Sequence, residues 1–276
     1  MRPREVRMET VIELMSPQPI CVTFDTPLHA CAVKMRRHHL RHLPMTNGDG
    51  RVIGVVRDLD VFRRGVLAGT SGELWMPFHD ADIDLEAGDV AEQPRLMVRP
   101  EDDLAATLRA KLSTSQDYAV VVDEDGHPMG MLTEHDALRM AQALEGPVSP
   151  WLSVDPEGIS ADEQIADAWE RMVVQGRRHL LVLDKGRLSG VISLRDLSVG
   201  LGAFGRDAPV GQIWRGERVH TLRPGQSCGE AAALMVAERV GCLPLTDEAG
   251  FPTAILTRTD LIRALVEHLD RNDGVL

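Results

Sequence analysis

The stretch Gly130-Met-Leu-Thr-Glu-His-Asp136 decides the fold, because the chain repeats its pattern three more times. The pattern is a small residue, two apolar residues, usually a hydroxyl residue, two variable residues and an aspartate. The other copies are Gly54-Val-Val-Arg-Asp-Leu-Asp60, Gly190-Val-Ile-Ser-Leu-Arg-Asp196 and Ala254-Ile-Leu-Thr-Arg-Thr-Asp260. Their aspartates are about 60 to 76 residues apart, and a repeat of this period indicates an array of similar units.

The surroundings of each copy predict the secondary structure of one unit. A turn rich in Asx and Gly precedes the motif, as in Asn47-Gly-Asp-Gly50, and apolar runs such as Tyr118-Ala-Val-Val-Val122 flank the turns. Farther upstream lies an amphipathic helix with a start signal such as Thr26-Pro27, and a second helix follows each aspartate. We therefore expect strand, helix, strand, strand, helix. Units of roughly 60 residues cannot bury both faces of so small a sheet alone, so the repeats should pair.

The first helix of each unit also keeps fixed offsets from the motif. Met35, Met172 and Met235 occupy the same helix position in the first, third and fourth repeats. The second repeat has Lys111 there.

This pattern resembles the CBS domain, a family named from cystathionine β-synthase, and the resemblance extends from about Met8 to Leu269. It implies a mixed α/β (α+β) fold of four β-α-β-β-α repeats that pair into two modules. We place the repeats at 8–66, 89–145, 146–203 and 208–270, with 1–145 as the first module and 146–276 as the second. The family often assembles two modules into a flat disc, which four repeats could close internally or through a homodimer.

Composition limits the class of protein. The formal net charge of −12 argues against nucleic acid or an anionic membrane as the main partner. No apolar run is long enough to span a membrane, and the charged N-terminus lacks the apolar core of a secretory signal, so we expect a cytoplasmic protein. The four cysteines lack C-x-x-C spacing and are expected to be reduced and structural. His38 and His42 have the spacing of a zinc pair without a third ligand, so we expect no metal site.

The repeated aspartates and hydroxyl residues are the candidate ligand-binding residues. A carboxylate at a helix start can accept both hydroxyls of a ribose, and the resemblance implies this role for Asp60, Asp136, Asp196 and Asp260. The hydroxyls three positions earlier can donate to a phosphate near the backbone N–H groups of the helix start, and these residues are Thr133, Ser193 and Thr257. The alternative is that these residues only cap helices, with the aspartate as the N-cap.

The copies are unequal, and the second and third carry the full pattern. In the fourth, Ala254 replaces glycine, and its methyl group could crowd a close backbone approach. In the first, Arg57 replaces the hydroxyl residue and either neutralises a phosphate or fills the pocket by pairing with Asp60 or Asp58.

Basic residues precede the second strand in two repeats. They are Arg177, Arg178 and His179 in the third repeat, and Arg36, Arg37, His38, His39, Arg41 and His42 in the first. Guanidinium and imidazolium groups suit a polyphosphate, and the alternative is a solvated helix end.

The sequence as a whole predicts a stand-alone regulatory protein that binds AMP, ADP, ATP or S-adenosylmethionine in clefts between paired repeats. The ligand would change the relative orientation of the repeats and thereby control an unidentified protein partner. No catalytic arrangement is recognised, so an enzyme is not expected, and no cofactor is required. Two alternatives stay open. One is a structural module with empty sites, and the other is a sensor of a dinucleotide or second messenger, which the basic residues around His38–His42 favour.

Overall fold

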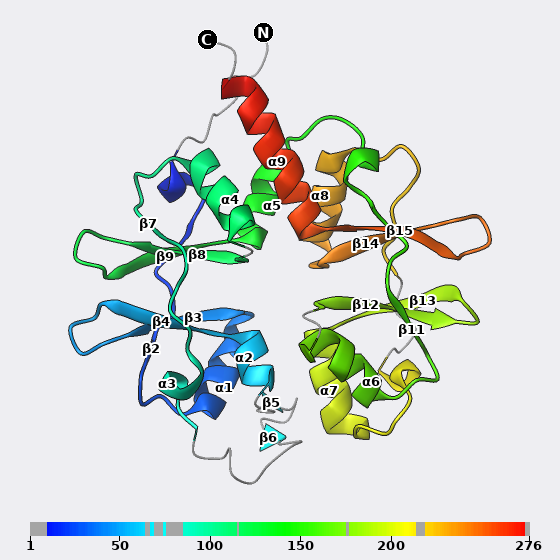
Figure 1. The fold of residues 1–276 in the computed structure, drawn as a ribbon, viewed down its shortest axis with the longest axis horizontal. Coiled ribbons are helices and arrows are strands. Elements are labelled where there is room, and N and C mark those ends of the chain that lie inside the picture. The colour runs from blue at the N-terminus through cyan, green and yellow to red at the C-terminus, as the bar shows by residue number, and fades with distance from the viewer. Residues whose placement is uncertain are drawn as a thin grey trace.

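The computed structural model describes residues 10–63, 67–68, 74–75, 85–114, 116–174, 177–213 and 219–273, with only the backbone for a few of them. Four lobes, each a small sheet covered by helices, lie around a common centre (Figure 1). The start of the predicted first repeat and most of the connection between the first two repeats lie outside the described residues.

The first two repeats follow the predicted order of elements. In the first these are β2 (Val22–Thr23), α1 (Leu28–His38), β3 (His42–Thr46), β4 (Val52–Arg57) and α2 (Asp58–Arg63). In the second they are β7 (Met97–Val98), α4 (Leu104–Ser113), β8 (Tyr118–Val122), β9 (Pro128–Thr133) and α5 (Glu134–Ala141). In both, the first strand runs parallel to the second, and the second and third form an antiparallel hairpin.

The last two repeats differ from this order in two places. The third has β11 (Gly158–Ser160), α6 (Ile165–Trp169), β12 (His179–Asp184), β13 (Arg187–Ser193) and α7 (Leu194–Phe204), and a π-helical turn, η4 (Glu170–Val174), extends α6. The fourth has α8 (Cys228–Ala237), β14 (Cys242–Thr246), β15 (Pro252–Thr257) and α9 (Arg258–Asp273). Its described residues contain no first strand, and the Leu222 N–H instead donates to the Pro244 carbonyl at 2.8 Å. The predicted mixed fold of four repeats is confirmed.

Shorter elements connect the repeats. They are η1 (Val11–Glu13), β1 (Ser16–Pro17), β5 (Leu67–Ala68), β6 (Leu74–Trp75), α3 (Ala87–Val90), η3 (Ser149–Trp151), β10 (Ser153–Val154) and η5 (Val210–Gln212). None of the described helices is long and apolar enough to cross a membrane.

Two of these short strands cross to the neighbouring repeat. β1 lies at the start of the first repeat but pairs with β9 of the second, and β10 lies at the start of the third but pairs with β15 of the fourth. Gly130 permits the first crossing, since a Cβ there would lie 2.9 Å from the Ser16 carbonyl oxygen. Ala254, on β15, pairs with Val154 of β10. The backbone that approaches this position is therefore the crossing strand.

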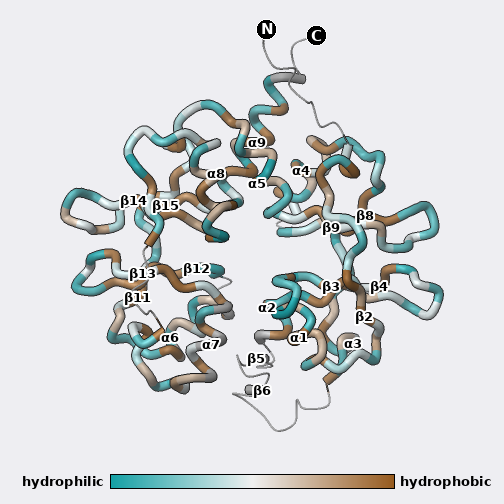
Figure 2. The backbone as a smooth tube through the Cα atoms, turned by 180° about the vertical axis from the view of Figure 1, so that it is seen from behind, coloured by the Kyte–Doolittle hydropathy of each residue, from teal (hydrophilic) through white to brown (hydrophobic). Residues whose placement is uncertain are grey.

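The two sheets of each pair of consecutive repeats lie against each other. In the first pair, Val55, Tyr118, Val120, Val122 and Met131 form a buried cluster between the sheets. At the rim, the Val52 N–H donates to the Gly126 carbonyl at 2.9 Å, and in the other pair Leu188 donates to Gly250 at 2.9 Å. The hairpin loops form this rim and are mainly hydrophilic, whereas the sheets are mainly hydrophobic (Figure 2).

The second and fourth repeats share one hydrophobic core, which joins the two halves of the chain. α5 packs against α8 and α9, and α4 packs against α9. The buried core includes Leu108 and Ala137 of the second repeat together with Met235 and Leu265 of the fourth. The two pairs of repeats are therefore closed into a disc within one chain, which is the internal arrangement of the two that the sequence left open (Figure 1).

Candidate functional site

The repeated hydroxyl and aspartate form capping boxes at the helix starts. The Thr133 N–H and hydroxyl donate to Asp136 Oδ2 at 2.8 and 2.6 Å, and those of Ser193 donate to Asp196 Oδ2 at 2.7 and 2.6 Å. The N-cap is therefore the hydroxyl residue, with aspartate at N3, and the prediction of aspartate as the cap was wrong. Thr257 and Asp260 repeat the pattern at 2.9 and 2.6 Å. The capping interpretation thus accounts for one oxygen of each of these carboxylates.

The second carboxylate oxygen distinguishes Asp196 from the other three. In Asp60, Oδ1 accepts a hydrogen bond from Arg57 at 2.7 Å. In Asp136 it accepts one from Ser16 at 2.8 Å, and in Asp260 it accepts one from Arg263 at 2.8 Å. These three aspartates are 2 to 7% exposed. Asp196 is exposed, and its Oδ1 has no hydrogen-bond partner among the described residues. The third repeat alone therefore presents an accessible carboxylate oxygen at this position within the described part of the chain.

Arg57 fills the first site. Its Nε and Nη2 donate to the two oxygens of Asp60, both at 2.7 Å, and Nη2 also donates to Glu92 at 2.6 Å. The hydrogen bond to Asp60 raises the Arg57 pKa above its ordinary value. Of the two sequence interpretations of Arg57, the geometry matches the one in which it pairs with its own aspartate.

Asp117 joins three repeats through its carboxylate. Its Oδ2 accepts from His42 of the first repeat at 3.0 Å and from Arg178 Nη2 of the third at 2.5 Å. Burial alone would raise the Asp117 pKa, but His42 and Arg178 outweigh burial and hold it well below its ordinary range.

Other charged residues surround this carboxylate. Arg41, Arg178 and Arg258 come from three repeats, and each influences the ionisation of His179. Burial, and then these guanidinium groups, lower the His179 pKa to about 3. His179 is therefore neutral at pH 7, whereas the sequence analysis counted imidazolium groups among the candidates for polyphosphate. Burial and the nearby Arg41 lower the Arg258 pKa to about 10, which leaves it charged at pH 7.

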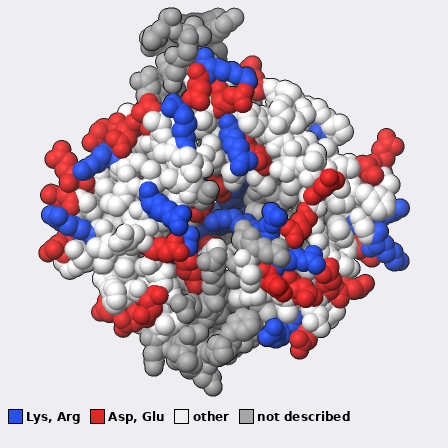
Figure 3. Space-filling view, in the orientation of Figure 1, with Lys and Arg blue, Asp and Glu red and all other residues white. Residues whose placement is uncertain are grey.

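We call this set the central cluster, consisting of Arg41, Arg178, His179, Arg258, Asp58, Asp117 and Glu134. A face of the disc is hollowed at its middle, and Lys and Arg side chains gather there beside acidic ones (Figure 3). The hairpins place the helix starts next to the cluster, because Ser193 is the partner of His179 across β12 and β13. The third repeat therefore has its exposed carboxylate and its basic residues at the same end of one hairpin.

The sequence prediction did not select several of these residues, and one residue that it did select lies apart from them. Arg258, Asp117 and Glu134 were not selected, although each directly precedes or follows a repeated strand, which is the signal that could have identified them. Arg177, which was selected for phosphate, is 58% exposed and pairs with Glu157 at 3.0 Å. No described contact joins Arg177 to the central cluster.

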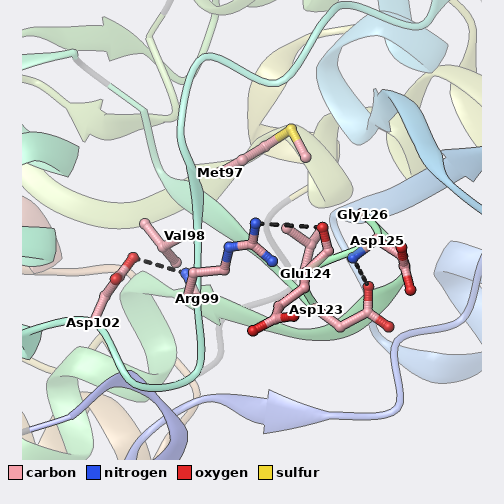
Figure 4. A pocket seen from close by; sticks show the side chains of 9 residues that line it. Met97, Val98, Arg99, Asp102, Asp123, Glu124, Asp125 and Gly126 are labelled. Carbon is pink, nitrogen blue, oxygen red and sulfur yellow. Dashed lines mark hydrogen bonds between the residues drawn. The ribbon is translucent and has the colours of Figure 1, made fainter.

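A pocket of about 340 Å³ lies at the other end of the second repeat, next to the turn between β8 and β9 (Figure 4). Its charged lining is mainly acidic, and Arg99 crosses it with Nη2 near the Glu124 carbonyl at 3.5 Å. None of the sequence-predicted site residues lines this pocket. Its acidic lining disfavours an anionic ligand.

The histidines and cysteines of the described residues form neither a metal site nor a disulfide. In the described ranges, no group of three or more His, Cys, Asp or Glu side chains could hold a metal ion. Cys31, Cys228 and Cys242 are buried and unpaired, and burial raises their pKa values, to about 11 for Cys31 and about 12 for Cys242.

Comparison with known proteins identifies the repeat. The sequence model of the CBS domain matches residues 11–66, 87–142, 150–201 and 210–267. Protein MJ1225 of Methanocaldococcus jannaschii is 24% identical over 261 residues, which cover 86% of this chain and 92% of that protein. The match to the crystal structure of MJ1225 covers 93% of this chain and 99% of the MJ1225 chain, with a TM-score of 0.80 and 22% identity. The match to the crystal structure of a Pyrococcus horikoshii protein covers 94% of this chain and 100% of that protein's chain, with a TM-score of 0.67 and 19% identity. These two structures share the fold.

Proposed function

Because the chain belongs to the CBS domain family, we propose that it is a regulatory protein that binds an adenosine-containing ligand at the third repeat and changes the relative orientation of its repeats. The observation that supports this most is the exposed Asp196, whose Oδ1 has no partner in the described structure. A carboxylate with a free oxygen at a helix start can accept the two hydroxyls of a ribose. The ligands proposed are AMP, ADP, ATP or S-adenosylmethionine.

The phosphate groups of a nucleotide would extend toward the central cluster. Ser193 stands opposite His179, and Arg178 precedes His179, so both lie next to the proposed ribose position. Guanidinium groups bind phosphate through paired N–H donors. Thr133 with Asp136 and Thr257 with Asp260 are the next candidate positions, where a ligand would displace Ser16 or Arg263 from the aspartate.

The central cluster offers a way to convert binding into a change of orientation. Arg178 of the third repeat is held by Asp117 of the second, which also binds His42 of the first. A phosphate that bound Arg178 would compete with Asp117 for it and weaken this link between repeats. Binding and orientation are then coupled, because the ligand favours the arrangement in which Arg178 is released. A protein partner would respond to the altered surface.

A structural module with unoccupied sites is the second candidate function. The observation that favours it is that all the Ser and Thr hydroxyls of the repeated motif bond to their own aspartates, as helix caps do. On this interpretation, replacing Asp196 would change stability alone.

Isothermal titration distinguishes the two candidates. The ligand-free protein is titrated with AMP, ADP, ATP and S-adenosylmethionine, alongside Asp196→Ala and Glu230→Ala. Glu230 is a matched control, because it forms a capping box with Ser227 on α8 and lies outside the proposed site. Both variants should lose about 0.5–2 kcal/mol of stability through the cap. We expect Asp196→Ala to weaken binding at least about tenfold through loss of a charge-assisted hydrogen bond, and Glu230→Ala to bind as the wild type does.

If Asp196→Ala and Glu230→Ala bind the ligand equally tightly, Asp196 does not bind the ribose. If the folded wild type bound none of the four compounds at millimolar concentration, the adenosyl proposal would fail and the structural module would stand.

A further inference from the structure

Lys111 occupies a core position in the second repeat. The other three repeats have Met35, Met172 and Met235 at this helix position, and all three are buried. Lys111 is 1% exposed, and its ammonium makes no hydrogen bond or ion pair within the described part of the chain. A buried ammonium without a partner destabilises a folded protein, whereas methionine at the same place packs without that penalty. The position therefore carries a cation that packing does not require.

The Lys111 ammonium lies within electrostatic range of the central cluster. Burial lowers the Lys111 pKa below its ordinary value, and the nearby carboxylates of Glu134 and Asp117 act in the opposite direction. Among the described residues, Arg99 Nη1 is the single fully buried side-chain nitrogen or oxygen atom without a partner. The partnerless ammonium of Lys111 is therefore not fully sealed, and the small exposed part of this side chain lies at its charged end.

The carboxylates near Lys111 are engaged by other groups. Asp117 accepts from His42 and Arg178, and the Glu134 carboxylate accepts from the Thr259 hydroxyl at 2.9 Å. The four repeats thus each supply one cation to the same region, and these are Arg41, Lys111, Arg178 and Arg258. Of the four, Lys111 is the one with neither an ion pair nor a hydrogen bond among described residues.

We propose that Lys111 is an anion-binding residue whose ammonium takes a phosphate group at the centre of the disc, so that the ligand is a phosphorylated nucleotide rather than S-adenosylmethionine. This inference rests on the proposed function, because it assigns the charged part of the ligand bound there. A phosphate supplies the acceptors that the ammonium lacks. S-Adenosylmethionine carries a sulfonium cation and no phosphate, so it does not offer the Lys111 ammonium the group proposed here.

The test is Lys111→Met, which installs the residue that the other repeats carry. Wild type and variant are titrated with ATP, adenosine, S-adenosylmethionine and inorganic tripolyphosphate. We expect affinity for ATP and tripolyphosphate to fall about tenfold or more, with adenosine binding unchanged and the thermal midpoint of the variant at or above that of the wild type. Lys34→Met is the matched control, because Lys34 lies on the equivalent helix of the first repeat, beside Met35. Lys34→Met should leave the affinities for ATP and tripolyphosphate unchanged.

The outcomes separate this inference from the proposed function. If the wild type binds ATP and Lys111→Met binds it equally well, Lys111 is a packing residue and the adenosyl site stands. If tripolyphosphate binds and depends on Lys111 while adenosine compounds fail to bind, the anion site stands and the adenosyl proposal falls. S-Adenosylmethionine binding as tight as that of ATP would overturn the ligand class.

Discussion

Asp117 takes the place of a cation in its repeat. Arg41 and Arg178 stand just before the second strand of the first and third repeats, and Asp117 stands at this position in the second. Its carboxylate binds both His42 and Arg178. One acidic substitution in the repeat pattern therefore creates the ion-pair network that links three repeats.

The pH dependence of stability should reveal this network. The folded Asp117 pKa lies below the unfolded value of about 4, so its stabilising effect is complete above pH 4 and is lost as the pH falls through the folded value. Asp117→Asn should lower the free energy of unfolding by about 1–3 kcal/mol at pH 7. The difference from wild type should shrink when urea unfolding is repeated at pH 3. Asp125→Asn, at a side chain 73% exposed, is the control. A difference that is independent of pH would exclude the network as its source.

Sequence reasoning at the residue scale selected Asp196 and Ser193 because they belong to the repeated motif, and Arg178 because basic residues cluster before the second strand. It could not rank the four aspartates, because their difference lies in Oδ1 partners that come from elsewhere, such as Ser16, which is far from Asp136 in the sequence. It placed Lys111 at the helix position that holds methionine in the other repeats but assigned it no role, because the missing partner of the ammonium is a property of the assembled structure. The ligand roles of all these residues stay predictions.

At the scale of elements, strands, hairpin turns and helices follow from local patterns. Their order was predicted correctly for the first two repeats, whereas the third has an additional π-helical turn and the described residues of the fourth contain no first strand. The crossing strands were not predicted. β1 and β10 are two residues each, and their pairing depends on contacts made after the repeats assemble. The same holds for η1, which lies at the start of the first repeat while Val11 and the adjoining Leu14 pack in the core of the second.

Two residues of the crossing segment, Ile12 and Leu14, allow its contribution to stability to be tested. Leu14→Ala should lower the free energy of unfolding by about 2–5 kcal/mol, because Leu14 is 4% exposed and its removal leaves a cavity. Ile12→Ala should change it by less than about 0.5 kcal/mol, because Ile12 is 54% exposed. Urea denaturation measures both. Equal effects of the two changes would show that the start of the first repeat does not stabilise the second.

At the scale of the whole molecule, the cores differ in how many repeats they join. The core shared by the second and fourth repeats includes Leu265, whereas Leu180 belongs to a core whose buried residues, apart from Val210, come from the third repeat. The sequence predicted paired repeats but left open how the pairs meet, because the apolar faces of the helices do not specify which neighbour covers them. The structure resolves this by packing α5 against α8 and α9.

Hydrogen exchange should show the difference between these cores. Leu265→Ala should destabilise by about 2–5 kcal/mol and speed exchange in both α5 and α9. Leu180→Ala, at a side chain equally buried, should speed exchange in β12 and β13 and leave α5 protected. Faster exchange confined to α9 in the first variant would mean that the two halves open independently.

The covalent link between the halves has a consequence for symmetry. Two copies of a one-module protein that formed such a disc would have to carry every substitution twice, so a lysine at the place of Lys111 would appear again at that of Met235 and set two buried ammonium groups into one assembly. A single chain escapes this duplication. The second repeat can carry a lysine where the fourth keeps methionine, and the first can close its site with Arg57. Four copies of one pattern in a single chain are therefore free to become four different sites.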